Sequence, residues 1–103
     1  MKGVCLKFYT YEFQKHHGKV VYEWLLELAK KNGIHGGSVF RTIAGYGRHG
    51  VMHEEHFFEL ASNVTVQIEF VISNEQSQQL IEEIKKEGLK LFYHTSEVDY
   101  NSI

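Results

Sequence analysis

The most chemically distinctive segment of the sequence is a run of glycines with an arginine and a histidine, Gly45-Tyr46-Gly47-Arg48-His49-Gly50. In a glycine-rich turn, successive backbone N–H groups can form a concave anion site, and positive φ angles let the backbone lie close to a phosphate. Arg48, and with it Arg41, could add charge-assisted hydrogen bonds. The segment therefore indicates a phosphate-binding turn, with a flexible loop hinge as the alternative interpretation.

The same glycines match the pattern G-x-G-x-x-G, which is typical of dinucleotide-binding proteins. In those proteins the glycines open a helix within a parallel β-α-β unit, and an acidic residue follows about twenty residues later. Here a strand-like segment of a predicted hairpin precedes the glycines, and no clear helix follows them. We therefore reject a Rossmann-type site.

Histidines offer a second kind of chemistry, because three of the seven in the chain, His49, His53 and His56, fall within residues 45–63. If part of this segment were helical, His49 and His53, or His53 and His56, would share a face and could bind a transition metal. The zincin motif is absent, since His53-Glu54-Glu55-His56 is one residue short of H-E-x-x-H. Metal binding is kept as the alternative interpretation, and we expect no bound metal.

Other candidate groups give weaker signals. His16-His17 could cap a helix or stack, and the sequence assigns the pair no role. Cys5 lies within strand-like alternation with no motif linking it to a histidine, which favours a packing role. The carboxylate pairs Glu54-Glu55 and Glu82-Glu83 look like solvated faces, and no serine has an activating frame. We therefore expect a protein without enzymatic activity.

Hydrophobic periodicity predicts the elements that position these residues. The first helix carries an apolar stripe and ends at Gly33, and the second opens at a capping box formed by Ser73 and Gln76 and ends at Gly88. Together they lie between strands in the order βαββαβ. The predicted strands span residues 1–10, 38–44, 64–72 and 90–94, the last with a possible extension to 100, and the predicted helices span 19–32 and 73–87.

Right-handed crossovers applied to this order predict an α+β ferredoxin-like fold, with a four-stranded antiparallel sheet and both helices on one face. Residues 1–103 are expected to form a single domain. Two neighbouring antiparallel strands need only about two to five connecting residues, whereas the loop between the second and third strands spans residues 45–63. A loop of that length is expected to carry function.

The predicted sheet has one face that no helix covers. Every strand but the third nevertheless offers large apolar side chains to both faces of the sheet. A face that contacts only solvent would normally carry polar side chains. We infer that sheets pack against each other between subunits, and the alternative is that these are scattered surface aromatics. The opposed pairs are Phe8 and Tyr9, Val39 and Phe40, and Leu91 and Phe92.

The composition excludes several classes of partner. The chain is 43% hydrophobic and 23% charged with a formal net charge of −2, and its basic residues are scattered, so we expect no nucleic-acid partner. Its apolar stretches are far too short to span a bilayer, and the N-terminus has no apolar signal-peptide core. We expect a cytoplasmic protein that does not insert into a membrane.

Residues 37–48, which read Gly-Ser-Val-Phe-Arg-Thr-Ile-Ala-Gly-Tyr-Gly-Arg, resemble the second strand and signalling-loop base of PII proteins, where a Gly-x-Thr-Val strand leads into Gly-Phe-Gly-Arg. The chain is more similar still to a PII-like branch known as domain of unknown function 190, short trimeric ferredoxin-like proteins. Its further counterparts in that branch are His17-Gly18, Tyr22-Glu23, residues 33–47, His53, Val66 and Ile68-Glu69.

The resemblance implies a homotrimer that binds an adenine nucleotide in the cleft between neighbouring subunits. Ser38 would help to read the base, and the backbone of Gly45, Tyr46, Gly47 and His49, with the Arg48 side chain, would lie along the ribose and phosphate. Nucleotide binding would order or displace residues 45–63 and so signal to an unidentified target protein, such as a membrane transporter.

Two departures from the PII pattern limit the charge available to phosphates. PII proteins carry a glycine-rich phosphate loop with a lysine after the second helix, where this chain reads Glu87-Gly88-Leu89-Lys90. They also carry basic residues in the C-terminal tail, where this chain reads Asn101-Ser102-Ile103. A triphosphate is harder to neutralise with less positive charge. AMP, ADP or a cyclic nucleotide is therefore expected to bind more tightly than ATP.

Overall fold

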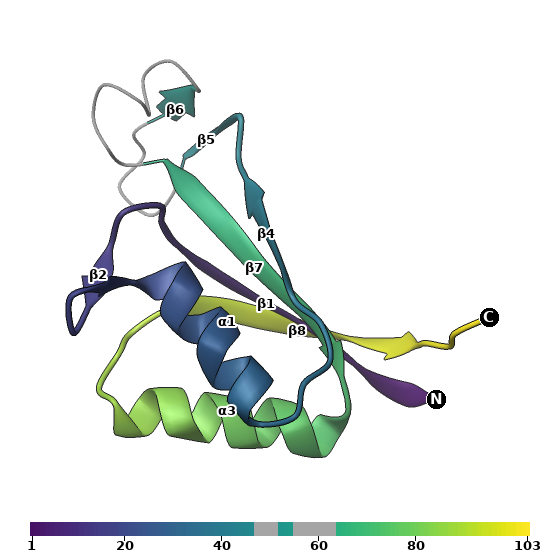
Figure 1. Cartoon of the computed structure of the whole chain (residues 1–103). Coiled ribbons are helices and arrows are strands. Elements are labelled where there is room, and N and C mark those ends of the chain that lie inside the picture. Colours follow the sequence, from purple (N-terminus) through teal and green to yellow (C-terminus); the bar gives the residue numbers. More distant parts are fainter. Residues whose placement is uncertain (47–51, 55–63) are drawn as a thin grey trace.

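A computed structural model of the chain describes residues 1–46, 52–54 and 64–103. It contains an antiparallel four-stranded sheet in the order β4-β7-β1-β8, and the two helices within the described residues, α1 and α3, cover one face of this sheet (Figure 1). The predicted α+β ferredoxin-like fold is confirmed. The strands are β1 (Lys2–Tyr11), β4 (Ser38–Arg41), β7 (Thr65–Ile72) and β8 (Phe92–Asp99).

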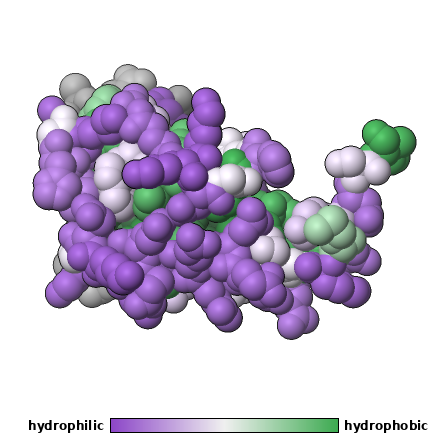
Figure 2. Space-filling model, turned by 60° about the horizontal axis from the view of Figure 1, so that its bottom comes forward, coloured by the Kyte–Doolittle hydropathy of each residue, from purple (hydrophilic) through white to green (hydrophobic). Residues whose placement is uncertain are grey.

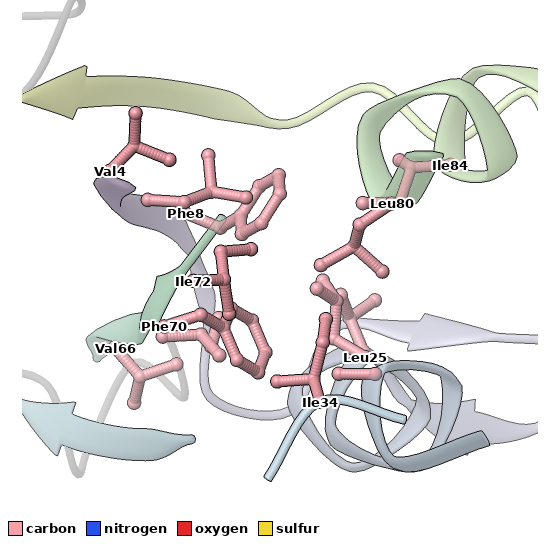
Figure 3. Packing of buried hydrophobic residues seen from close by; sticks show 13 residues of the cluster. Val4, Phe8, Leu25, Ile34, Val66, Phe70, Ile72, Leu80 and Ile84 are labelled. Carbon is pink, nitrogen blue, oxygen red and sulfur yellow. The ribbon is translucent and has the colours of Figure 1, made fainter. Parts of the chain in front are cut away.

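The core lies between the helices and alternate residues of the two central strands. The register pairs Leu6 with Phe70 and Phe8 with Ile68, which puts the even-numbered side chains of β1 and β7 on the helix-facing side. Phe8 and Phe70 meet edge to face with ring centroids 6.4 Å apart (Figure 3). Burying each such side chain contributes about 1.5–3 kcal/mol, so this layer dominates the stability of the fold.

Helix α1 (Val21–Lys31) is shorter than the predicted helix over residues 19–32. Its first predicted turn instead forms a small hairpin, in which β2 (Lys15–His16) pairs with β3 (Lys19–Val20). The connecting residues have positive φ angles, 52° at His17 and 78° at Gly18, as a tight two-residue turn requires. The predicted helix end is confirmed, because Gly33 has a φ of 80°.

Helix α3 (Asn74–Lys86) begins at the predicted capping box. The Ser73 hydroxyl accepts a hydrogen bond from the Gln76 backbone N–H at 3.1 Å, and the Gln76 side chain accepts one from the Ser73 N–H at 3.2 Å. The chain leaves the helix at Gly88, which has a φ of 72°. Local signals therefore predicted both ends of this helix.

The second strand of the sheet ends earlier than the predicted strand over residues 38–44. The Thr42 N–H and Oγ1 both donate to the Thr65 carbonyl oxygen, at 3.0 and 2.8 Å, and the chain then leaves the sheet. It continues as β5 (Ala44–Tyr46), which pairs with β6 (Met52–Glu54) in a separate ribbon beyond the end of the sheet (Figure 1). Part of the segment 45–63 is therefore a β-ribbon.

The last strand starts at Phe92, later than the predicted start at residue 90, and continues to Asp99, close to the predicted extension to residue 100. Leu91 precedes the strand and packs against the core instead of lying on a sheet face. Among the described residues, no helix is long and apolar enough to span a bilayer.

The sheet face opposite the helices carries aromatic side chains. Phe40 is 50% exposed and Phe92 is 66% exposed, and the Tyr9 and Phe92 rings lie 5.6 Å apart. The Tyr9 hydroxyl donates to Gln67 Oε1 at 3.1 Å and lies 3.0 Å from His94 Nε2. The surface over α3 is by contrast mostly hydrophilic (Figure 2). Apolar groups of the sheet therefore lie exposed in the single chain.

Candidate functional site

The predicted nucleotide-binding residues within the described part of the chain lie on the edge strand β4 and on the ribbon that follows it. Ser38 opens β4 and is exposed. The residue before it, Gly37, lies so close to the core that a Cβ there would sit 2.5 Å from Phe70 Cε1. A glycine is therefore needed at this point for β4 to reach its position at the edge of the sheet.

Ser38 and Arg41 lie on opposite faces of the sheet. The register pairs Ser38 with Glu69 on the face without helices, and Arg41 with Val66 on the helix-facing side. The Arg41 Nε donates to Glu12 Oε1 at 3.1 Å, in a partly exposed ion pair. The other N–H groups of the guanidinium are not part of this hydrogen bond, so the phosphate contact of Arg41 stays a prediction.

Gly45 and Tyr46 lie in strand β5, where they pair with His53 and Met52. Gly45 does not adopt the positive φ that glycine permits, since its φ lies outside the left-handed region. A Cβ at Gly45 would meet nothing within 4 Å, so the backbone has open space beside it. Tyr46 is 73% exposed. Both residues are therefore accessible to a ligand.

The rejection of a Rossmann-type site is confirmed, because Gly45 lies in an antiparallel ribbon and not at the start of a helix. The other three residues of the predicted phosphate turn, Gly47, Arg48 and His49, lie outside the described residues.

The alternative metal site required helical spacing of His49, His53 and His56. His53 lies in strand β6, so this premise does not hold at His53. His49 and His56 lie outside the described residues.

Cys5 is buried on the face of the sheet without helices, where its Sγ donates to Glu69 Oε1 at 3.1 Å. Burial raises the pKa of this thiol above 9.0, and the hydrogen bond and negative charge of Glu69 raise it further. A thiol with a raised pKa supplies little thiolate, which is the reactive form. The structure thus supports the predicted packing role of Cys5.

A cluster that the sequence did not predict joins the β2–β3 hairpin to the end of α3. Glu87 Oε1 lies 3.0 Å from His16 Nε2 and 3.3 Å from His17 Nε2. The hydrogen bond from His16 is the main reason why the pKa of Glu87 is lowered. The paired histidines are visible in the sequence, which assigned them no role. Their contact with Glu87 could not be predicted, because Glu87 is 71 positions from His16 and no local pattern connects them.

A cavity of about 220 Å³ lies between the C-terminal half of α3 and the start of β8, with Ile84, Leu89 and Tyr93 in its lining. The lining contains none of the residues that the sequence assigned to nucleotide binding. The candidate nucleotide site is therefore an exposed edge and ribbon, separate from this cavity.

Comparison with known proteins identifies relatives that match most of the chain. Residues 3–98 match the model of DUF190, a family described as "Uncharacterized ACR". The chain is 38% identical over 85 residues to a UPF0166 protein of Aquifex aeolicus, covering 82% of this chain and 81% of that protein. It is 36% identical over 93 residues to a UPF0166 protein of Methanocaldococcus jannaschii, covering 86% and 85%.

Solved structures with a similar fold are more distant in sequence. CPII, a nitrogen regulatory PII-like protein from Thiomonas intermedia K12 solved with ADP, AMP and bicarbonate, matches with a TM-score of 0.69 and 18% identity, covering 95% of this chain and 87% of that one. A putative PII-like signaling protein from Thermus thermophilus matches with a TM-score of 0.62 and 13% identity, over the same shares. At these identities the likeness concerns the fold.

Proposed function

The chain belongs to the DUF190 family, and we propose that it is a PII-like, single-domain, non-catalytic regulator that binds AMP or ADP. The fold likeness to CPII, whose structure contains ADP and AMP, carries the proposal. The exposed edge of β4 and the open backbone of β5 support it, because they leave polar groups accessible where the sequence resembles the PII signalling-loop base.

In the proposed site the nucleotide lies beside the edge of the sheet. The Ser38 hydroxyl at the start of β4 contacts the base, and the backbone at Gly45 approaches the ribose. The exposed Tyr46 ring provides a surface on which a base or ribose can pack. Gly47, Arg48 and His49 continue the site along the phosphates.

The proposed assembly is a homotrimer in which the faces without helices pack against each other. The 50% exposed Phe40 and 66% exposed Phe92 support this arrangement, since aromatic side chains on a sheet face are stabilised by burial against another subunit. A neighbouring subunit would complete the nucleotide cleft beside β4. Light scattering of the purified protein would contradict the assembly if the mass were that of a monomer.

The proposed preference for AMP or ADP over ATP rests on charge. Where PII proteins have a second glycine-rich phosphate loop with a lysine, this chain reads Glu87-Gly88-Leu89-Lys90, and its tail, Asn101-Ser102-Ile103, has no basic residue. Less positive charge is then available to neutralise a triphosphate. Nucleotide binding would change the position of residues 45–63 and thereby the surface offered to a target protein. The target would be a partner in the cytoplasm, such as the cytoplasmic side of a membrane transporter. The ligand can shift that equilibrium only by its difference in affinity for the two loop states.

Calorimetric titration of the full chain with AMP, ADP and ATP tests the proposal. We expect AMP or ADP to bind most tightly, and Arg48→Gln to weaken binding about tenfold or more, because a hydrogen bond from a charged group contributes about 1.5–3 kcal/mol. Lys86→Gln, which removes one exposed charge from α3, is the matched control. ATP binding at least tenfold tighter would refute the ligand preference, and no binding of any of the three would refute the function.

A further inference from the structure

The β2–β3 hairpin and the C-terminal end of α3 bring together three side chains of the kind that bind transition metals. The ligand atoms of His16, His17 and Glu87 all lie within 4.8 Å of one another, and both imidazoles face the same carboxylate oxygen. In Figure 1 the hairpin and this end of α3 lie on the same side of the molecule. We propose that these three residues bind a divalent transition-metal ion of the zinc class.

The distances suit a tetrahedral site. Zinc–nitrogen and zinc–oxygen bonds of about 2.0–2.1 Å place neighbouring ligand atoms of a tetrahedron about 3.3 Å apart. Glu87 Oε1 lies 3.0 Å from His16 Nε2 and 3.3 Å from His17 Nε2, so both of these ligand-to-ligand distances are already close to that value. The His17 side chain is 74% exposed, and its ring is free to adjust as the metal enters.

The two histidines are neighbours in sequence, and the turn makes their convergence possible. His17 has a φ of 52°, so the backbone reverses between the rings and their centroids lie 4.1 Å apart. At this separation one metal ion can accept a lone pair from each imidazole. The hairpin therefore presents the pair in a form suited to a shared cation.

Both halves of the site are held in place before any metal enters. The His16 ring is only 13% exposed and packs edge to face against Trp24, with centroids 4.9 Å apart. The hairpin is joined to α1 by a 2.8 Å hydrogen bond from the Val21 N–H to the Gln14 carbonyl. Glu87 is the C-cap of α3, and its N–H is hydrogen-bonded to the Glu83 and Ile84 carbonyls. Ordered ligands lower the entropic cost of binding.

The electrostatic setting favours a cation. The C-terminal end of a helix carries a partial negative charge, which attracts positive ions to Glu87. Lys85 and Lys86 in the last turn are exposed, so solvent screens their repulsion. Two nitrogen ligands and one oxygen ligand select zinc, copper or nickel over magnesium or calcium, which prefer oxygen. The His17 and Glu87 side chains are 74% and 42% exposed, so a water molecule can reach the metal and complete its coordination.

Titration of the metal-free chain with zinc chloride, without nucleotide, tests this site. His17→Asn removes the imidazole but tolerates the positive φ, and Glu87→Gln keeps the shape of the side chain. We expect one zinc ion per chain and at least tenfold weaker binding in each variant, because loss of even an outer-shell partner lowers metal affinity about 10–100-fold. Magnesium and calcium should not bind.

Two controls separate this site from other histidines. His35→Asn changes an exposed histidine elsewhere and should leave zinc affinity unchanged. The triple variant His49→Gln, His53→Gln and His56→Gln should also retain zinc binding. Wild-type protein that binds no zinc, a His17→Asn variant that binds as tightly as wild type, or loss of binding in the triple variant would each overturn the proposal.

A spectroscopic measurement on the unmutated chain gives an answer even if a variant fails to fold. Zinc should shift the ring proton resonances of His16 and His17 while leaving those of His35 and His94 in place. Shifts confined to other histidines would refute the site. Because nucleotide is absent from every sample, the outcome is independent of the proposed nucleotide binding.

Discussion

Replacement of Gly37 by alanine should destabilise the protein, because the added methyl group would enter the packed region between β4 and the core. A Cβ at this position would lie 2.5 Å from Phe70 Cε1, 2.8 Å from Phe70 Cδ1 and 3.0 Å from Leu26 Cδ2. Phe70 is 1% exposed and packs against Phe8, so its ring cannot move without disturbing the core. The clash must therefore be relieved by a shift of β4 or of the core itself.

The expected size of the effect follows from two opposing terms. Extra methyl groups in a well-packed core cost about 1–3 kcal/mol. Replacing glycine by alanine also lowers the conformational entropy of the unfolded chain. This stabilises the folded state by about 0.4–1 kcal/mol where alanine can adopt the native backbone conformation. The net loss in the free energy of unfolding for Gly37→Ala is then about 1–2 kcal/mol, and each kcal/mol lowers Tm by about 4–8 °C in a domain of this size.

Urea denaturation, followed by circular dichroism at one fixed protein concentration, measures this loss. Gly36→Ala is the matched control, because a Cβ at Gly36 would meet nothing within 4 Å, and it should be neutral or slightly stabilising. The fixed concentration matters because assembly would add to the apparent stability. Equal urea midpoints for Gly36→Ala and Gly37→Ala would refute the reasoning about the approach of β4 to Phe70.

Three further predictions concern single positions. Gly45→Ala should leave the free energy of unfolding unchanged within about 0.5 kcal/mol, because a Cβ there meets nothing within 4 Å. The same variant should weaken AMP or ADP binding in calorimetry, because the methyl group occupies space beside the backbone, and unchanged affinity would show that the nucleotide does not approach this residue. Ser73→Ala should lower the free energy of unfolding by about 0.5–2 kcal/mol through loss of the α3 cap, whereas Ser102→Ala in the exposed tail should not. Cys5 has a pKa raised above 9.0, so the folded state favours the neutral thiol: its stabilising contribution is complete below pH 9.0 and is lost as the pH rises through the folded-state pKa. Urea midpoints of wild type should therefore fall more steeply above pH 9.0 than those of Cys5→Ala, and parallel pH profiles would contradict this.

Several features of the fold could be predicted because their causes are local. Alternating apolar residues in 64–72 and the apolar stripe of the first helix assign each side chain to the core or to the surface. The capping box at Ser73 and the positive φ of Gly33 and Gly88 depend on atoms only a few positions apart. The order of these elements was then enough to predict the ferredoxin-like sheet.

The candidate nucleotide site was predicted less completely. Ser38, Gly45 and Tyr46 lie on accessible edges, as the proposed site needs. Arg41 is ion-paired with Glu12, a partner 29 positions away that no sequence pattern indicated. The hairpin around His17-Gly18 was also missed, because the helical stripe that follows it dominated the local pattern.

The sequence by itself therefore determined the four strands of the sheet, the two helices, the C-terminal ends of both helices, the start of α3 and the sheet order, since these follow from periodicity and from backbone preferences of neighbouring residues. Only the tertiary structure decided that Thr42 leaves the sheet, that Gly37 must be small and that Glu87 meets the two histidines. The physical reason is the same in each case. These features depend on contacts between segments that are distant in the chain, and their geometry exists only once the sheet and helices have packed together.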